Sequence, residues 1–154
     1  MRELKFRGFN KFKNKWIYGY PCDKPNALIT EFRFDEKLDE FVCCDANCRQ
    51  DIFRYEEIEE GTLNQFTGVK DKNRNEIYEG DIVKFAVFDL SFDVDENVEK
   101  FEKRYEKDEV VFANGRFIAG IKYGSNESLA LMQELEVVGN IYENPELLEN
   151  KNEK

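Results

Sequence analysis

Short runs of alternating apolar and polar residues, separated by turn residues, extend along much of the chain. The clearest example surrounds Asn114-Gly115, with Val110 to Phe112 before it and Phe117 to Tyr123 after it. Asn-Gly suits a type I′ turn, in which both central residues need a positive φ. Because side chains alternate between the two faces of a strand, the sequence predicts a fold built largely from hairpins.

Two other segments predict hairpins as well. In residues 1–20, period-two aromatic residues flank a turn at Asn10–Asn14. In residues 64–85, the charged turn Lys70–Asn75 separates two strands, and Gly80-Asp81 then opens a third. Glycine permits backbone angles that other residues resist, and aspartate bonds to nearby amides, so this pair favours a strand entry.

The remaining elements are predicted from shorter patterns. Alternation indicates strands at Leu28–Phe34 and around Phe41–Cys43, whereas Asp51–Glu60 fits either a helix or a strand that runs into a turn. The last strand is predicted at Leu135–Tyr142. Pro145 then sits at the first position of a short helical turn.

One segment has a helical period instead. Val94, Val98, Phe101 and Tyr105 are spaced four, three and four residues apart, which places them on one face of a helix. We therefore expect an inserted amphipathic helix over residues 94–107. Residues 89–109 contain nine acidic and four basic residues, so this helix is either an acidic docking face or a lid on the core.

The predicted fold class is mostly β (α+β). Its core is a small, bent, β-barrel-like set of hairpins, with the inserted helix and the C-terminal helical turn added. A chain of 154 residues suits a single domain, here residues 1–148, either undivided or with two lobes at 1–60 and 61–148. Residues 149–154 are expected to be a frayed tail.

Charge and composition restrict the function. The chain has 23 basic and 33 acidic residues and a net charge of −10, which disfavours direct binding to phosphate backbones. Solubility alone explains such a charge, and docking on a basic partner is the alternative. No segment reaches the roughly 20 apolar residues of a membrane span, and the N-terminus has no apolar signal stretch, so we expect a cytoplasmic protein.

Catalytic and metal chemistry have little support in the sequence. The chain contains no histidine, so Ser-His and Cys-His pairs are excluded within it. The four cysteines, Cys22, Cys43, Cys44 and Cys48, do not form two C-x2-4-C pairs of the kind that bind zinc. Metal-dependent hydrolysis by paired carboxylates needs no histidine, but no motif fixes such a pair. We predict a non-enzymatic protein without metal or cofactor.

The N-terminal hairpin offers an alternative. Its basic and aromatic residues could hold a nucleotide or another small molecule by stacking, as an alternative to packing as an ordinary strand pair. This candidate ligand site consists of Arg7, Lys15, Trp16, Tyr18 and Tyr20.

Three segments resemble the YopX family of phage and prophage proteins. They are the start, with R-x-x-x-F-R and K-W-x-Y-G-Y, the T-G-x-K-D-K…I-Y-E-G-D-I-V segment, and the ending V-x-G-N-I-Y-E-N-P-E-L-L. The family pattern usually has glycine where Arg74 stands, so a tight turn there is in question. The resemblance implies a mostly-β fold with a bent barrel-like core and a phage origin, and it brings no catalytic residues.

These observations together predict a phage accessory protein that works in the host cytoplasm. It would dock on a host protein, such as a nucleic-acid-binding or defence enzyme, and inhibit it through an acidic surface. The residues expected to make that contact are Asp95, Glu99, Glu102 and Glu106. Self-association is left open.

Overall fold

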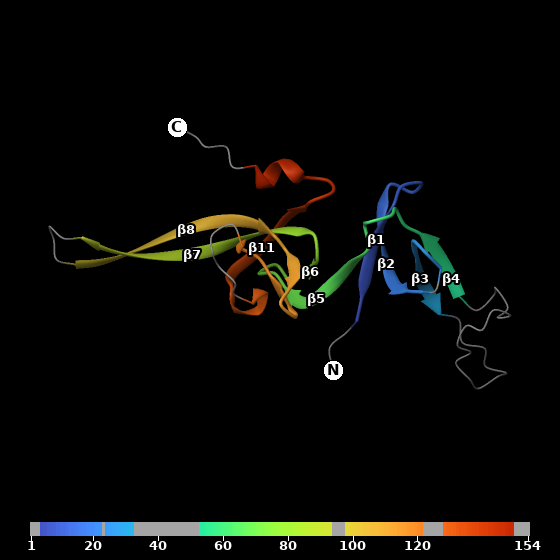
Figure 1. The fold of residues 1–154 in the computed structure, drawn as a ribbon, viewed down its shortest axis with the longest axis horizontal. Helices are drawn as coiled ribbons and strands as arrows, with labels where there is room; N and C mark the ends of the chain where they lie inside the picture. Colours follow the sequence, from blue (N-terminus) through green and yellow to red (C-terminus); the bar gives the residue numbers. More distant parts are fainter. Residues whose placement is uncertain (1–3, 23, 33–52, 94–97, 122–127, 150–154) are drawn as a thin grey trace. The chain divides into compact units, whose positions relative to one another are not determined.

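The computed structural model describes residues 4–22, 24–32, 53–93, 98–121 and 128–149. The chain divides into two compact units, Met1–Gln65 and Phe66–Lys154 (Figure 1). The assignment of residues 1–148 to a single domain stays a prediction, and each unit is described separately below.

The first unit is an antiparallel sheet in the order β4-β3-β2-β1. The strands are β1 (Phe6–Asn10), β2 (Lys15–Pro21), β3 (Ala27–Phe32) and β4 (Phe53–Glu57). Residues Asn64 and Gln65, at the start of β5 (Asn64–Lys70), pair with β1. The hairpin predicted in residues 1–20 is confirmed, and the ambiguous segment 51–60 forms the strand β4. The strand predicted at Phe41–Cys43 lies outside the described residues.

The core of the first unit lies on one face of this sheet. Ile17, Leu28 and Ile58 are buried there, and Phe6 packs against them. Gly19 lets β2 and β3 approach closely, since a Cβ at this position would lie 2.2 Å from the carbonyl oxygen of Ile29. A backbone atom cannot move aside as a side chain can, so this approach requires glycine.

The second unit contains three groups of paired strands. The end of β5 pairs with β6 (Glu76–Tyr78), and β9 (Val111–Ala113) pairs with β10 (Arg116–Ile118). A three-stranded sheet has the order β11-β7-β8, from β11 (Gln133–Asn140), β7 (Asp81–Asp93) and β8 (Val98–Glu109). Two short 3₁₀ helices, η2 (Leu129–Leu131) and η3 (Pro145–Leu148), precede and follow β11.

The core of the second unit gathers side chains from most of these elements. Its buried members are Ile77, Val83, Phe85, Val110, Phe117, Ala119, Leu129 and Leu135. Val137 packs against this cluster, Ile82 is fully buried, and Ile141 is half-buried. Phe112, in contrast, is 53% exposed, and its ring lies against that of Phe117, with 5.0 Å between the ring centroids.

The predicted amphipathic helix is wrong. Residues 98–109 form β8, which pairs with β7 in continuous register from Asp93↔Val98 to Ile82↔Glu109, and residues 94–97 lie outside the described part. The apolar spacing that suggested a helix falls on Val, Phe and Tyr, which also favour strands. The long partner strand β7 decides between the two, since it pairs with one edge of β8 along its whole length.

The predicted barrel is also wrong, because the sheets are open. Closing a barrel requires the first and last strands of a sheet to pair, but β4 and β8 each end a sheet in the described part of the chain. The C-terminal helical turn is present as η3. No helix in the described ranges has the length and apolar character to cross a membrane.

The turn between β5 and β6 shows how the chain accommodates Arg74. Its backbone has φ +69°, the left-handed conformation that favours glycine. The Arg74 amide donates to the carbonyl of Asp71, and the Asp71 amide donates to the carbonyl of Asn75, both at 2.9 Å. The hairpin therefore forms as predicted, with a strained residue where the family pattern has glycine.

We predict that Arg74→Gly stabilises the chain by about 0.5–1 kcal/mol. Relief of the left-handed strain on a residue with a Cβ exceeds the extra freedom that glycine gains in the unfolded chain. Urea unfolding measures the change. Arg74→Ala is the matched control, because it removes the same side chain but keeps the Cβ. An equal gain in both variants would assign the effect to the arginine side chain and not to the backbone.

Candidate functional site

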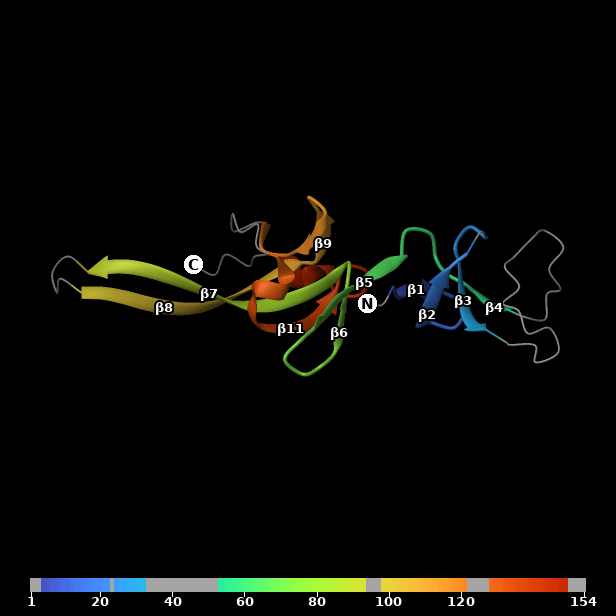
Figure 2. The same cartoon turned by 90° about the horizontal axis from the view of Figure 1, so that it is seen from below.

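The longest hairpin of the second unit extends beyond its third strand. β11 pairs with β7 only over Asp81–Ala86, whereas β7 and β8 pair with each other as far as Asp93 and Val98. Among the described strands, the outer half of this hairpin is therefore a two-stranded ribbon, which both views show (Figures 1 and 2). We call residues 87–93 and 98–104 the ribbon.

The structure places the predicted docking acids on and beside this ribbon. Asp95 lies outside the described residues, and Glu99 is opposite Phe92 in the backbone register. Glu102 is exposed. Glu106 is half-buried and forms an ion pair with Arg104, with 2.9 Å between Nε of Arg104 and Oε1 of Glu106. The continuous acidic face expected from a helix is thus interrupted, since Arg104 lies between Glu102 and Glu106.

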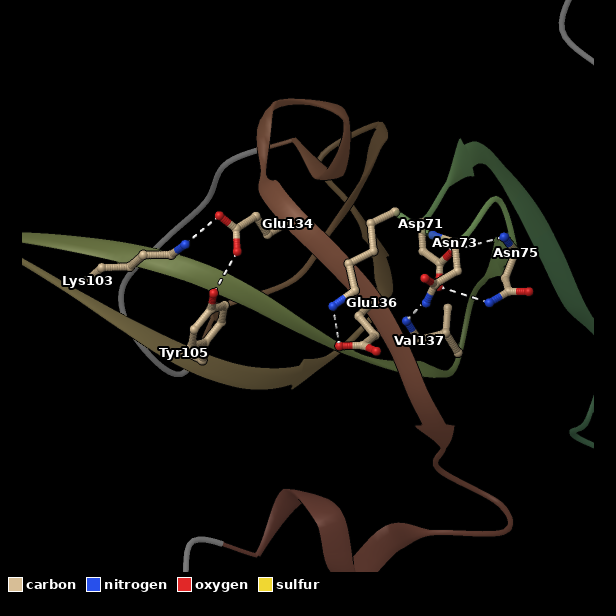
Figure 3. A network of polar contacts seen from close by, with 9 residues as sticks. Asp71, Asn73, Asn75, Lys103, Tyr105, Glu134, Glu136 and Val137 are labelled. Carbon is tan, nitrogen blue, oxygen red and sulfur yellow. Dashed lines mark hydrogen bonds and ion pairs between the residues drawn. The ribbon is translucent and has the colours of Figure 1, made fainter.

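A second group of charges crosses from β8 to the start of β11. Glu134 accepts hydrogen bonds from Lys103 and, at 2.6 Å, from the hydroxyl of Tyr105 (Figure 3). The ammonium of Lys84 lies 4.5 Å from the centroid of the Tyr105 ring. We call Lys84, Lys103, Tyr105 and Glu134 the Tyr105 cluster.

A β-bulge brings Glu134 into this cluster. The register of β11 shifts between Gln133 and Glu136, and Glu134 there has φ +55°. The hydrogen bond from Lys103, and then that from Tyr105, lowers the pKa of Glu134, and the same bond raises the pKa of Lys103. The sequence shows no sign of this cluster, because its partners are 29 and 31 residues apart and depend on the bulge.

A groove of about 240 Å³ lies beside the cluster, between the end of β5 and the start of β11. Its apolar lining includes Val69, Leu129 and Leu135, and its charged lining includes Lys72 and Glu134. Lys72 is paired with Glu136 at 2.7 Å. The groove is therefore lined by apolar side chains and by charged side chains that are already paired. Its lining residues include no nucleophile paired with a base.

Asp71 closes one end of this groove and joins the β5–β6 turn to β11. Its carboxylate accepts hydrogen bonds from the amides of Asn73 and Asn75, the side chain of Asn75 and the amide of Val137, at 2.8–3.2 Å (Figure 3). Burial pushes the pKa of Asp71 up, but these hydrogen bonds, led by those from Asn75, outweigh it and lower the pKa. Both oxygens are used structurally, so Asp71 is not a free general base.

In the first unit, the candidate ligand residues lie mostly on one face of the sheet. The Arg7 guanidinium is 4.4 Å from the centroid of the Trp16 ring. Tyr18 and Tyr20 follow at alternate positions of β2 and are 48% and 43% exposed. Lys15 falls at the other alternation of β2, opposite Asn10, so it does not join the other four residues.

The cysteines give no further site within the described residues. Cys22 is half-buried and its thiol lies 3.6 Å from the carbonyl oxygen of Ala27, while Cys43, Cys44 and Cys48 fall outside the described part. The ranges that the structure describes hold no group of three or more cysteine, aspartate or glutamate side chains arranged to bind a metal. The expectation of no metal and no cofactor stays a prediction.

Comparison with known proteins agrees with the geometry in pointing to a family and not to a reaction. The family model described as YopX protein matches residues 5–149. The crystal structure of protein EF1440 from Enterococcus faecalis is similar, with a TM-score of 0.54 and 26% sequence identity. The match covers 97% of this chain and 100% of that one. Comparison with curated proteins gives no match.

We predict that Asp71→Asn lowers the free energy of unfolding by about 1–3 kcal/mol at pH 7, since hydrogen bonds to a charged acceptor are lost. A lowered pKa means that the charged form stabilises the fold above the ordinary value of 3.8, and this stability is lost as pH falls below it. The gap between parent and variant should therefore narrow below about pH 4.

Urea unfolding at pH 7 and at low pH measures this gap. Glu60→Gln, which neutralises an exposed acid of the first unit, is the control and should stay within about 0.5 kcal/mol of the parent. An Asp71→Asn gap that stays constant across the pH range would show that the charge of Asp71 is not what the turn uses.

Proposed function

The chain belongs to the YopX family, and we propose that within it this protein is a non-enzymatic binding module of phage or prophage type. It docks on a basic surface of a host protein, such as a nucleic-acid-binding or defence enzyme, and inhibits it in the host cytoplasm. The observation that supports this best is the two-stranded ribbon that extends beyond β11.

The distribution of charge supports the same proposal. Residues 1–65 contain 11 basic and 13 acidic residues, and residues 66–154 contain 12 and 20, so the net charges are −2 and −8. Within the second unit, nine of the acids lie in residues 89–109. A segment with this excess of acids attracts a basic partner over a distance and speeds its association.

The register of the ribbon adds a further argument. Glu102 stands directly opposite Asp89, and like charges at paired positions of a sheet reduce its stability. These two acids therefore do not stabilise the folded chain. A contribution to binding a basic partner would explain why both are present.

We predict that Glu99→Lys with Glu102→Lys slows association with the partner about 10-fold or more at low salt, with a smaller effect at high salt. Glu106 is left unchanged because it pairs with Arg104. The partner is first captured from host lysate with the tagged chain. Its association rate is then measured at two salt concentrations.

The matched control is Glu146→Lys with Glu149→Lys, two exposed acids outside the ribbon that give the same change in net charge. Its association rate should fall much less than that of the ribbon variant. Equal rates for the two variants would leave only a general effect of net charge, and the ribbon would then not be the docking site.

A second candidate is supported by the aromatic face of the first unit. Arg7, Trp16, Tyr18 and Tyr20 share one face of β1 and β2, an arrangement suited to stacking on a nucleobase. If a nucleotide binds there, its addition should raise the melting temperature of the parent but not that of Tyr18→Ala with Tyr20→Ala. Phe12→Ala, at an 89% exposed position in the β1–β2 turn, is the control. No shift with any linear or cyclic nucleotide would exclude this candidate.

A further inference from the structure

We propose that two copies of this chain associate edge to edge along β8, in antiparallel orientation, to form a dimer. β8 is the last strand of the sheet β11-β7-β8, and no described strand pairs with its other edge. A strand at the edge of a sheet can add a further strand that fits it. The partner here is a second copy, so the inference goes beyond docking on a host protein.

The sequence of β8 is complementary to itself in two antiparallel registers, one centred on Lys103 and one slid from it by three residues. With Lys103 at the two-fold axis, acidic residues face basic ones and the two aromatic residues face each other. Each pair occurs twice because of the symmetry, and such opposite pairs stabilise neighbouring strands. The facing residues are Glu99 with Lys107, Lys100 with Glu106, Phe101 with Tyr105, and Glu102 with Arg104.

Neighbouring registers lack this match. A slide of one residue in one direction places Glu99 opposite Glu106, and in the other direction it places Lys100 opposite Lys107. Charged residues along an edge strand normally prevent association between sheets. In β8 their order instead excludes most strands and most registers but accepts a second copy of the chain.

The Tyr105 cluster removes the main objection to this register, which is the contact of Lys103 with its symmetry mate. Each Lys103 is already bound to Glu134 of its own chain, and Tyr105 donates to the same carboxylate. Two lysines would therefore meet with two glutamates beside them. The strained bulge that aims Glu134 at β8 thus prepares the centre of the interface.

Among the described elements of the second unit, η3 approaches this edge at one end. η3 contacts β8, and Figure 1 shows it near the end of the strand that leads into β9. The ribbon portion of β8, at the opposite end, lies away from η3 in both views (Figures 1 and 2).

Sedimentation equilibrium of the purified chain over a range of concentrations tests the proposal. The mass should rise from 18.3 kDa toward twice that value as the concentration increases. Glu99→Lys and Lys107→Glu, each alone, place like charges opposite each other twice and should weaken the dimer about 10-fold or more. An equal mixture of the two variants should recover the parent's association, because both pairs are again opposite in the heterodimer.

Glu146→Lys, at an exposed site outside β8, is the control and should associate as the parent does. A parent that stays monomeric at every concentration, or a mixture no better than its components, would overturn the proposal. Loss of the dimer in Lys107→Glu but not in Glu99→Lys would overturn the register centred on Lys103. That result fits a slide of three residues, in which Lys107 faces Glu102 and Glu99 faces Val110. The measurement uses the chain alone, so it stands or fails independently of host docking.

Discussion

The second unit depends on a set of hydrogen bonds that fasten β11 to two turns preceding β7. At one turn, the Asp71 carboxylate accepts a hydrogen bond from the amide of Val137. The Lys72 amide donates a hydrogen bond to the carbonyl of Leu135 at 2.8 Å. At the other turn, the Ile141 amide donates to the carbonyl of Gly80 at 2.9 Å. β11 is about 60 residues further along the chain than these turns, so its place in the sheet is held from both ends. The groove, the bulge at Glu134 and the Tyr105 cluster all follow from that placement.

The hydrogen bonds between β11 and these two turns explain why two of the motifs that resemble the YopX family lie where they do. The matched segments T-G-x-K-D-K…I-Y-E-G-D-I-V and V-x-G-N-I-Y-E-N-P-E-L-L are the two sides of this set of hydrogen bonds, and their polar residues are used in turns. Asp81, for example, is almost fully buried, and its carboxylate accepts a hydrogen bond from the amide of Tyr78 at 2.8 Å. These two motifs therefore describe a scaffold. Of the surfaces that we propose for binding, the ribbon lies outside the motifs, whereas the aromatic face of the first unit is formed by the third motif, at the start of the chain.

The sequence predicts those parts of the fold that local signals control. Asn114 and Gly115 have φ of +52° and +76°, as the predicted turn between β9 and β10 requires, and the β5–β6 hairpin forms around its charged turn. The sequence predicts a helix where β8 forms, because the apolar spacing suits both structures and the strand depends on its pairing with β7. The position of Glu134 depends on a bulge, and the sheets are open because their first and last strands do not pair. The strand state of β8, the position of Glu134 and the open sheets have no local signal in the sequence.

The two uses proposed for β8 involve the same acids. In the proposed register, Glu99 and Glu102 face Lys107 and Arg104 of the second copy, so association of two copies and docking on a basic partner compete. A dimer would join two second units of net charge −8 through one continuous sheet, with the outer ends of their ribbons pointing in opposite directions. Repulsion between such acidic units opposes association, so the six opposite-charge pairs across the β8 edge must offset it. A basic partner that binds Glu99 and Glu102 would remove these opposite-charge pairs, so its binding should shift the equilibrium from the dimer toward the single chain.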